Sequence, residues 1–237
     1  TNEWTSKTPM PTPRSGFAIT VYQNKIYTIG GSVGYGYVGN NEVYDPVSNT
    51  WETKTSMPTP RADLCANLVN DKIYLIGGKK YSSTTPFFNQ TNINEVYDPA
   101  NDSWSTKPPV PTPVQGYASV VFSSKIYVMG GSLESLSLEK TLLTDATQVF
   151  DPQNNSWSLA ANLPHAVSYG AAGTTEGYMA PERIYYIGGY SVGKFTGQAQ
   201  AYNSENNSWS IVEAMPTSRA HLGIAVVNDV LYAIGGL

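Results

Sequence analysis

A six-residue pattern that occurs five times constrains the fold of this chain more than any other feature. An apolar residue, a tyrosine, a variable residue and a second apolar residue are followed by two glycines. The copies cover residues 26–31, 73–78, 126–131, 184–189 and 231–236, so their first glycines lie 47, 53, 58 and 47 residues apart. Self-similarity at a period of about 50 residues predicts a repeat architecture.

Other markers keep the same period and define the contents of one unit. The chain has five tryptophans, one per unit: Trp4, Trp51, Trp104, Trp157 and Trp209. A Tyr-Asp-Pro triplet or a weaker equivalent precedes each of the last four, and an apolar-Pro pair follows all five. Short apolar and β-branched runs, punctuated by Gly, Pro, Asn and Asp, predict four strands per unit. The sequence therefore predicts an all-β propeller in which each unit is one blade.

The double glycine, followed by a tyrosine and a tryptophan seven residues apart as in Tyr44 and Trp51, resembles the Kelch repeat. This resemblance covers essentially the whole chain and implies one Kelch-type β-propeller domain of four-stranded blades over residues 1–237. The expected blades lie at approximately 14–57, 61–110, 114–163, 167–215, and 219–237 completed by residues 1–10. The last unit lacks a third strand. This favours the interpretation that the chain is a piece of a longer, six-bladed ring over the alternative of a five-bladed ring with one imperfect blade.

Composition excludes several classes of function. Charged residues make up 14% of the chain and the formal net charge is −4, with no cluster of Lys and Arg, which argues against a nucleic-acid partner. Apolar runs are only a few residues long, so no membrane-spanning helix is expected. The single cysteine, Cys65, excludes an intramolecular disulfide.

Candidate binding residues lie in two sets of loops. The Kelch resemblance implies that the loops from second to third strand and from fourth to first strand share one face, which binds partners. The first set offers aromatic and basic side chains, which suit recognition: Tyr35, Tyr37, Lys80, Tyr81, Phe87, Phe88, Tyr190 and Phe195. In the second set, one aligned position holds Gly16, Asp63, Gly116, Tyr169 and His221, and the three residues with side chains are candidates for the mouth of the channel.

These features favour a non-enzymatic module that binds a protein or a glycan, as one part of a larger polypeptide or assembly. The alternative is a carbohydrate-active enzyme, resembling Kelch-type mutarotases, epimerases or oxidases, that acts at the channel mouth. A copper site like that of galactose oxidase would need both histidines, His165 and His221. No Gly-x-Ser-x-Gly elbow and no phosphate-binding glycine loop is present, so neither a catalytic group nor a cofactor or metal is expected.

Four Asn-x-Ser/Thr acceptor sequences bear on the compartment. They begin at Asn89, Asn101, Asn154 and Asn206, and the last three fall in the turn before a tryptophan. The repeat itself favours Asn and Ser in that turn, so the signal for glycosylation is weak. Together with the low Lys content, it favours an extracellular or cell-surface location over the cytoplasm.

Overall fold

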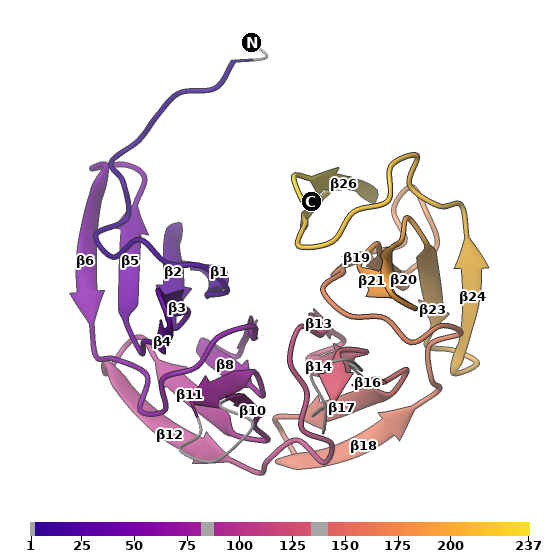
Figure 1. The fold of residues 1–237 in the computed structure, drawn as a ribbon, viewed down its shortest axis with the longest axis horizontal. Helices are drawn as coiled ribbons and strands as arrows, with labels where there is room; N and C mark the ends of the chain where they lie inside the picture. The colour runs from indigo at the N-terminus through magenta and orange to yellow at the C-terminus, as the bar shows by residue number, and fades with distance from the viewer. Residues whose placement is uncertain (1–2, 82–87, 134–141) are drawn as a thin grey trace.

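The computed structural model describes residues 3–81, 88–133 and 142–237, and its regular elements there are all β-strands. Four antiparallel four-stranded sheets stand around a common axis and form an incomplete ring (Figure 1). The predicted propeller of four-stranded blades is confirmed. The first sheet consists of β1 (Ala18–Tyr22), β2 (Lys25–Ile29), β5 (Asn41–Asp45) and β6 (Thr50–Lys54).

The next three blades repeat this order along the chain, with the first strand innermost and the fourth outermost (Figure 1). The second blade contains β7 (Cys65–Val69), β8 (Lys72–Ile76), β11 (Asn94–Asp98) and β12 (Ser103–Lys107). The third contains β13 (Ala118–Phe122), β14 (Lys125–Met129), β17 (Thr147–Asp151) and β18 (Ser156–Ala160). The fourth contains β19 (Ala171–Thr175), β20 (Arg183–Ile187), β23 (Ala199–Asn203) and β24 (Ser208–Val212).

The apolar core lies between neighbouring blades rather than within one blade. Each of three buried clusters combines residues of two adjacent blades; in the first, Tyr27 and Ile29 of one blade meet Ile73 and Tyr97 of the next. A single sheet has two faces to cover, so stacking the blades is what buries the alternating apolar residues of their strands.

Glycine and tryptophan join successive blades at the inner and outer ends of this packing. Gly30 adopts φ 71°, and a Cβ there would lie 2.7 Å from the carbonyl oxygen of Arg61 in the next blade, so a side chain is excluded. On the outer side, the indole N–H of Trp104 donates to the carbonyl of Thr55 in the preceding blade at 2.9 Å. The indoles of Trp51, Trp157 and Trp209 make the equivalent bond. The repeat markers therefore serve blade packing.

The fifth unit consists of one hairpin, β25 (Gly223–Val227) and β26 (Val230–Ile234), which forms a two-stranded sheet in the described chain. Residues 3–17 form no strand: the start of this segment extends away from the ring, where Trp4 is 91% exposed, and from Thr8 onward the segment lies on the first blade (Figure 1). The predicted completion of the last blade by residues 1–10 is therefore not formed in this structure. In the complete blades the fourth strand pairs with the third, and the fifth unit has no third strand in the described chain with which the terminal segment could pair.

Four small hairpins rise from the loops between second and third strands. They are β3 (Ser32–Val33) with β4 (Gly36–Tyr37), β9 (Lys79–Tyr81) with β10 (Phe88–Gln90), β15 (Ser132–Leu133) with β16 (Leu142–Leu143), and β21 (Tyr190–Ser191) with β22 (Lys194–Phe195). Isolated bridges such as Ala62 to Lys79 and Ser168 to Tyr190 connect these hairpins to the loops that precede the first strands. Both sets of loops therefore share one face of the propeller.

Candidate functional site

A belt of main-chain hydrogen bonds runs around the inner end of this face. The amide of Asp63 donates to Gly16, that of Gly116 to Asp63, that of Tyr169 to Gly116, and that of His221 to Tyr169, at 2.5 to 3.0 Å. All five residues have left-handed φ values between 55° and 62°. A left-handed residue other than glycine costs about 1–2 kcal/mol, so the loop geometry holds Asp63, Tyr169 and His221 in a conformation they would otherwise avoid. We call these five residues the rim.

Each side chain of the rim lies over the rim residue of the preceding blade, and two of the three residues covered in this way are glycines. A Cβ on Gly16 would lie 2.5 Å from a carboxylate oxygen of Asp63, and one on Gly116 would lie 2.6 Å from the ring of Tyr169. The ring of His221 stacks on that of Tyr169, with centroids 4.4 Å apart and planes 34° apart. The two glycines are therefore part of the site, since they provide the space that their neighbours fill.

Asp63 is the polar centre of the rim. Its Oδ2 forms an ion pair with Nζ of Lys79 at 2.7 Å and accepts a hydrogen bond from the hydroxyl of Tyr169 at 3.2 Å. The structure thus brings together three predicted candidates, Asp63, Tyr169 and His221. The ion pair with Lys79 compensates the negative charge of the Asp63 carboxylate, and the hydrogen bond from Tyr169 orients it across the rim.

Two tyrosines near Asp63 are held in the neutral form. Burial, followed by the negative charge of Asp63, raises the pKa of Tyr37 to about 12. Burial also raises the pKa of Tyr169, with further contributions from the charge of Asp63 and from the hydrogen bond to it. At neutral pH both phenols therefore act as hydrogen-bond donors rather than as bases.

The first small hairpin borders a hollow of about 190 Å³, which is also lined by Lys79, the ion-pair partner of Asp63. Its walls are Ser32, Gly34, Tyr35, Tyr37 and Lys79. Tyr35, at the tip of the hairpin, is 99% exposed, while Tyr37 is half-buried. Of the two predicted tyrosines, Tyr37 thus lies near the rim and Tyr35 projects into solvent.

The other described loop candidates belong to the second and fourth small hairpins. Tyr81 is exposed, and Tyr190 packs edge-on against the half-exposed Phe195 at 6.0 Å. Lys80 is half-buried on β9. Phe88 belongs to β10, where it pairs with Tyr81, and Phe87 lies outside the described residues.

The residue that sequence reasoning missed is Lys79. Side chains alternate along a strand, so only one of two consecutive lysines faces Asp63, and the choice depends on the bridge between Ala62 and Lys79. Spacing in the sequence does not reveal that bridge. The sequence feature that could have identified Lys79 is its position directly after Gly77-Gly78, where successive blades make contact.

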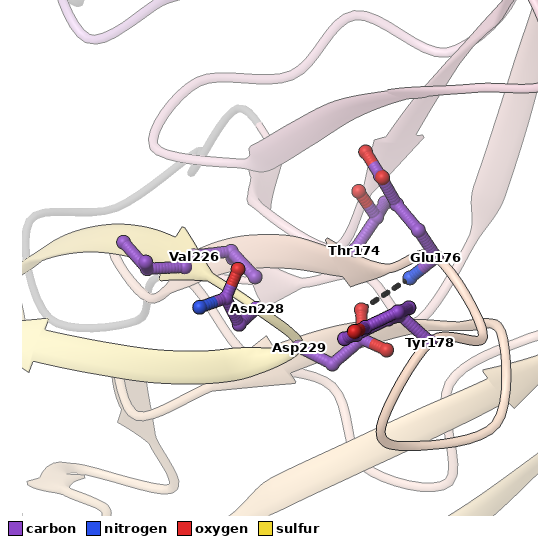
Figure 2. A pocket seen from close by; sticks show the side chains of 7 residues that line it. Thr174, Glu176, Tyr178, Val226, Asn228 and Asp229 are labelled. Atoms are coloured by element: carbon purple, nitrogen blue, oxygen red, sulfur yellow. Dashed lines mark hydrogen bonds between the residues drawn. The ribbon is translucent and has the colours of Figure 1, made fainter.

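A larger hollow of about 570 Å³ lies at the other end of the inner strands (Figure 2). It is lined by Thr174, Glu176, Tyr178, Val226, Val227, Asn228 and Asp229. The carboxylate of Asp229 accepts hydrogen bonds from the amides of Glu176 and Met179, both at 2.7 Å, and these bonds lower its pKa to about 2. Asp229 therefore stabilises the loop between β19 and β20.

The surroundings of the single cysteine, Cys65, do not activate its thiol. Burial raises the pKa of the Cys65 thiol, which disfavours the reactive thiolate. Over residues 3–81, 88–133 and 142–237, no three His, Cys, Asp or Glu side chains gather as metal ligands would. No helix in that part of the chain has the length and apolarity required to cross a membrane.

The predicted glycosylation sites differ in exposure. Asn101, Asn154 and Asn206 are exposed in the turns before the fourth strands. Their side chains form hydrogen bonds within those turns, to Asp98, Asp151 and Ser208. Asn89 is half-buried on β10. Modification of these residues stays a prediction.

Known proteins resemble this chain over most of its length. Two matches to the KLHDC2/KLHL20/DRC7 Kelch-repeats domain cover residues 1–131 and 52–236. The solved structure titled "Structure of YjhT" superposes with a TM-score of 0.81 at 18% identity and covers 97% of this chain and 74% of that one, which supports the fold.

Relatives with curated names are considerably longer. Kelch-like protein terF of Aspergillus terreus is 27% identical over 153 residues, which are 62% of this chain and 32% of that protein. Kelch-like protein 36 of Bos taurus is 30% identical over 132 residues, 55% of this chain and 21% of that protein. The chain thus matches less than a third of the length of each. With five repeats, blades of the predicted topology and a family match along nearly its whole length, the chain belongs to the Kelch-repeat family.

Proposed function

We propose that this chain is a non-enzymatic binding module that holds a protein partner on the face bearing the rim. The observation that carries the proposal is the contact between Asp63 and Tyr169, two left-handed residues from different blades whose side chains meet across a glycine. Backbone strain of this kind persists where the surrounding structure enforces it, and such positions cluster at functional sites.

The surface around the rim has the chemistry of a protein-binding site. Aromatic side chains provide large contact areas at low entropic cost, and the exposed Tyr35, Tyr81 and Phe195 present such groups on the small hairpins of the same face. Lys79 and Asp63 add a charge pair that fixes orientation. Membership of the Kelch family supports the same role.

A glycan remains the second candidate ligand, because aromatic rings such as Tyr190 and Phe195 also pack on sugars and tyrosine hydroxyls bond to them. The enzyme alternative receives less support. The carboxylate of Asp63 is engaged by Lys79 and Tyr169, which leaves it poorly placed as a general base. We also propose an extracellular or cell-surface location, on the weak basis of the acceptor sequences.

Site-specific photocrosslinking tests the face. A photoreactive amino acid replaces Tyr35 or Tyr81 in separate variants, and the protein is exposed to an extract of the cells that produce it. The matched control replaces Leu159, which is 71% exposed on the outer strand β18. We expect the same protein to be captured from positions 35 and 81 and not from 159.

The captured protein is then purified and its affinity measured against His221→Ala, Tyr81→Ala and Leu159→Ala. A loss of affinity in the first two variants only supports the proposal. Unchanged affinity in both rim-face variants overturns it. Glycan-array binding that depends on Tyr190 would reassign the ligand class, and acceleration of sugar anomer exchange that His221→Ala abolishes would reassign the protein as an enzyme.

A further inference from the structure

The connection between the first and second strands is longer in the fourth blade than in the others. In the other three complete blades and in the fifth unit, two left-handed residues join these strands: Gln23-Asn24, Asn70-Asp71, Ser123-Ser124 and Asn228-Asp229. Such two-residue turns match the twist of a hairpin. In the fourth blade, residues 176–182 separate β19 from β20 instead. Blade packing does not require the longer loop, since the same two strands pair in the other units without it.

The loop of residues 176–182 is held by hydrogen bonds at its ends and in its middle. The hydroxyl of Thr175 donates to the carbonyl of Pro181 at 2.5 Å and accepts from the amide of Arg183 at 3.0 Å. The carboxylate of Asp229, in the neighbouring hairpin, accepts from three loop amides, those of Glu176, Met179 and Ala180. A loop that is already fixed loses little conformational entropy when a partner binds it.

The largest apolar side chains of this loop lie in solvent. Tyr178 is 84% exposed and Met179 is 71% exposed, although the amide of Met179 is anchored on Asp229. Both side chains therefore bury little apolar area within the fold. An exposed aromatic ring next to an exposed methionine, on a fixed loop, is typical of a surface that contacts another protein.

Tyr178 also borders the larger hollow of about 570 Å³ (Figure 2). Thr174, Glu176 and Tyr178 contribute one side of it, and β25 with the turn at Asn228 and Asp229 contributes the other. Among the described residues that line the hollow, none belongs to β26. The hollow therefore lies between the inner strand and loop of one hairpin and the inner strand and turn of the next.

These two hairpins lack a charge pair that the other blades have. In each of the first three blades, a lysine at the start of the second strand forms an ion pair with an aspartate at the end of the third, as Lys72 does with Asp98 at 2.7 Å. The fourth blade has Arg183 and Asn203 at these positions, and the fifth unit has Val230 in place of the lysine. The compensation of charge seen in the other blades is therefore missing here.

Three carboxylates and one cation remain on the two hairpins. Glu176 and Glu182 are exposed, and neither they nor Asp229 takes part in an ion pair within the part of the chain that the structure describes. Glu182 lies across the loop from Gly177, since a Cβ on that glycine would be 3.7 Å from the Cβ of Glu182. The cation, Arg183, donates to the carbonyl of Glu182 at 2.6 Å. The excess negative charge around the exposed aromatic ring favours a positively charged partner.

We propose that the loop of residues 176–182 and the turn at Asn228 and Asp229 form a second docking surface, which binds a basic protein segment at the end of the inner strands opposite the rim. An arginine or lysine of this segment lies on the ring of Tyr178 and pairs with the carboxylate of Glu176. Cations are attracted both to aromatic faces and to carboxylates. Met179 provides the adjoining apolar contact.

Asp229 has a different part in this surface. Its two carboxylate oxygens already accept hydrogen bonds from the amides of Glu176 and Met179, so it adds negative charge and fixes the loop rather than binding the cation directly. The hydrogen bonds from these amides lower its pKa to about 2, which keeps the carboxylate ionised at neutral pH.

Other occupants fit this surface less well. Nucleic acid carries the same sign of charge and is repelled. A second copy of this chain would have to supply a basic segment, and the sequence contains no cluster of Lys and Arg. Among the residues described by the structure, no three potential metal ligands gather here or elsewhere. A basic segment of another protein satisfies both the charge and the exposed apolar side chains.

Fluorescence anisotropy with labelled synthetic peptides tests the proposal on the whole chain. The probe has the sequence Ser-Leu-Arg-Gly-Arg-Leu-Ser, and a control peptide carries citrulline in place of both arginines, which keeps their shape and removes their charge. We expect the arginine peptide to bind at least about tenfold more tightly, the difference typical of a hydrogen bond between charged groups. Added salt should reduce the difference, because the charges are exposed.

Protein variants locate the bound peptide. Tyr178→Ala and Glu176→Gln should each weaken binding of the arginine peptide at least about fivefold. The matched controls are Tyr35→Ala, which removes an exposed ring on the rim face, and Glu205→Gln, which neutralises an exposed carboxylate between β23 and β24. Both controls should keep the full affinity. All four side chains are exposed, so we expect every variant to fold, and denaturant unfolding verifies this.

Several results would overturn the proposal. They are an absence of peptide binding in the millimolar range, equal affinity for the two peptides, full affinity in both Tyr178→Ala and Glu176→Gln, and an equal loss in Glu205→Gln. A loss in Tyr35→Ala alone would assign the peptide to the rim face. Free arginine that binds as tightly as the peptide would assign the surface to a small cation. Photocrosslinking from the rim face is a separate test, so either proposal can fail without the other.

Discussion

The hydroxyl of Tyr169 donates a hydrogen bond to the carboxylate of Asp63 over 3.2 Å, although the two residues are 106 positions apart in the sequence. They belong to the loops that precede β7 and β19, and Gly116 of the intervening blade lies beneath the tyrosine ring. The Tyr169 side chain therefore reaches from the fourth blade across the third to the second. The absence of a side chain at Gly116 makes this contact possible.

Replacement of Gly116 by alanine tests that relationship. The added Cβ would meet the Tyr169 ring at 2.6 Å, so the ring must move away from Asp63. We expect the free energy of unfolding to fall by about 1–2 kcal/mol from backbone strain and by about 1–3 kcal/mol from crowding. Denaturant unfolding measures the sum.

Gly34→Ala is the matched control for this crowding. Gly34 has φ 56°, against 57° for Gly116, and no atom lies within 4 Å of its Cβ position. Its loss of stability should therefore be limited to the backbone contribution of about 1–2 kcal/mol. Equal losses in the two variants would mean that Tyr169 does not depend on the space above Gly116.

Alkaline pH should weaken the fold. The pKa of Tyr37 is about 12 in the folded chain, whereas an unfolded tyrosine titrates near 10. Stability is thus complete below about pH 10 and falls as the pH rises toward 12, because only the unfolded state loses the proton. Denaturant unfolding at pH 9, 10 and 11 should show a smaller decline in Tyr37→Phe than in the unaltered protein. Tyr35→Phe, with its ring in solvent, should follow the unaltered protein.

The buried ion pair of Arg61 with Glu95 has an uncharged counterpart in the third blade, where Val114 and Gln148 occupy the equivalent positions. The second blade should accept this uncharged pair in place of its ion pair. Arg61→Val alone leaves Glu95 buried without its partner and should cost about 3–5 kcal/mol. Adding Glu95→Gln recreates the valine and glutamine of the third blade. We expect the double variant to lose about 1–3 kcal/mol less than the sum of the single losses. Strict additivity in chemical unfolding would contradict a coupled pair.

Trp104→Ala should destabilise the chain strongly, because the indole donates to Thr55 and its ring lies 5.0 Å from that of Tyr97. The expected loss is about 3–5 kcal/mol. Trp4→Ala removes the same side chain from an exposed position and should change stability by at most about 0.5 kcal/mol. Thermal melting compares the two, and a wild-type melting temperature for Trp104→Ala would contradict its role between blades.

The fold was predictable because blade packing imposes the same residues in every unit. Gly30 must approach the next blade closely, and Trp104 must reach back to the preceding one, so both recur at a fixed period. The alignment of the five loops also grouped Asp63, Tyr169 and His221, which the structure brings together. Their role in binding stays a prediction.

The contacts among those residues were not predictable from spacing. Lys79 reaches Asp63 only through the pairing of two loops, and the role of Gly116 depends on the direction in which Tyr169 points. The pairing of arginine with glutamate was hidden for another reason. Loop lengths differ, so the partners are 28 residues apart in the first blade and 34 in the second.

Main-chain hydrogen bonds link successive rim residues independently of their side chains, and this separates backbone support of the site from ligand recognition. The amides of the four rim residues after Gly16 donate to the carbonyl of the rim residue in the preceding blade whichever side chain they carry, as glycine, aspartate, tyrosine and histidine all do here. Substitution at these positions must respect only a left-handed backbone and the volume above the neighbour. Ligand preference can therefore diverge among descendants of this protein without rebuilding the circle of blades that supports it.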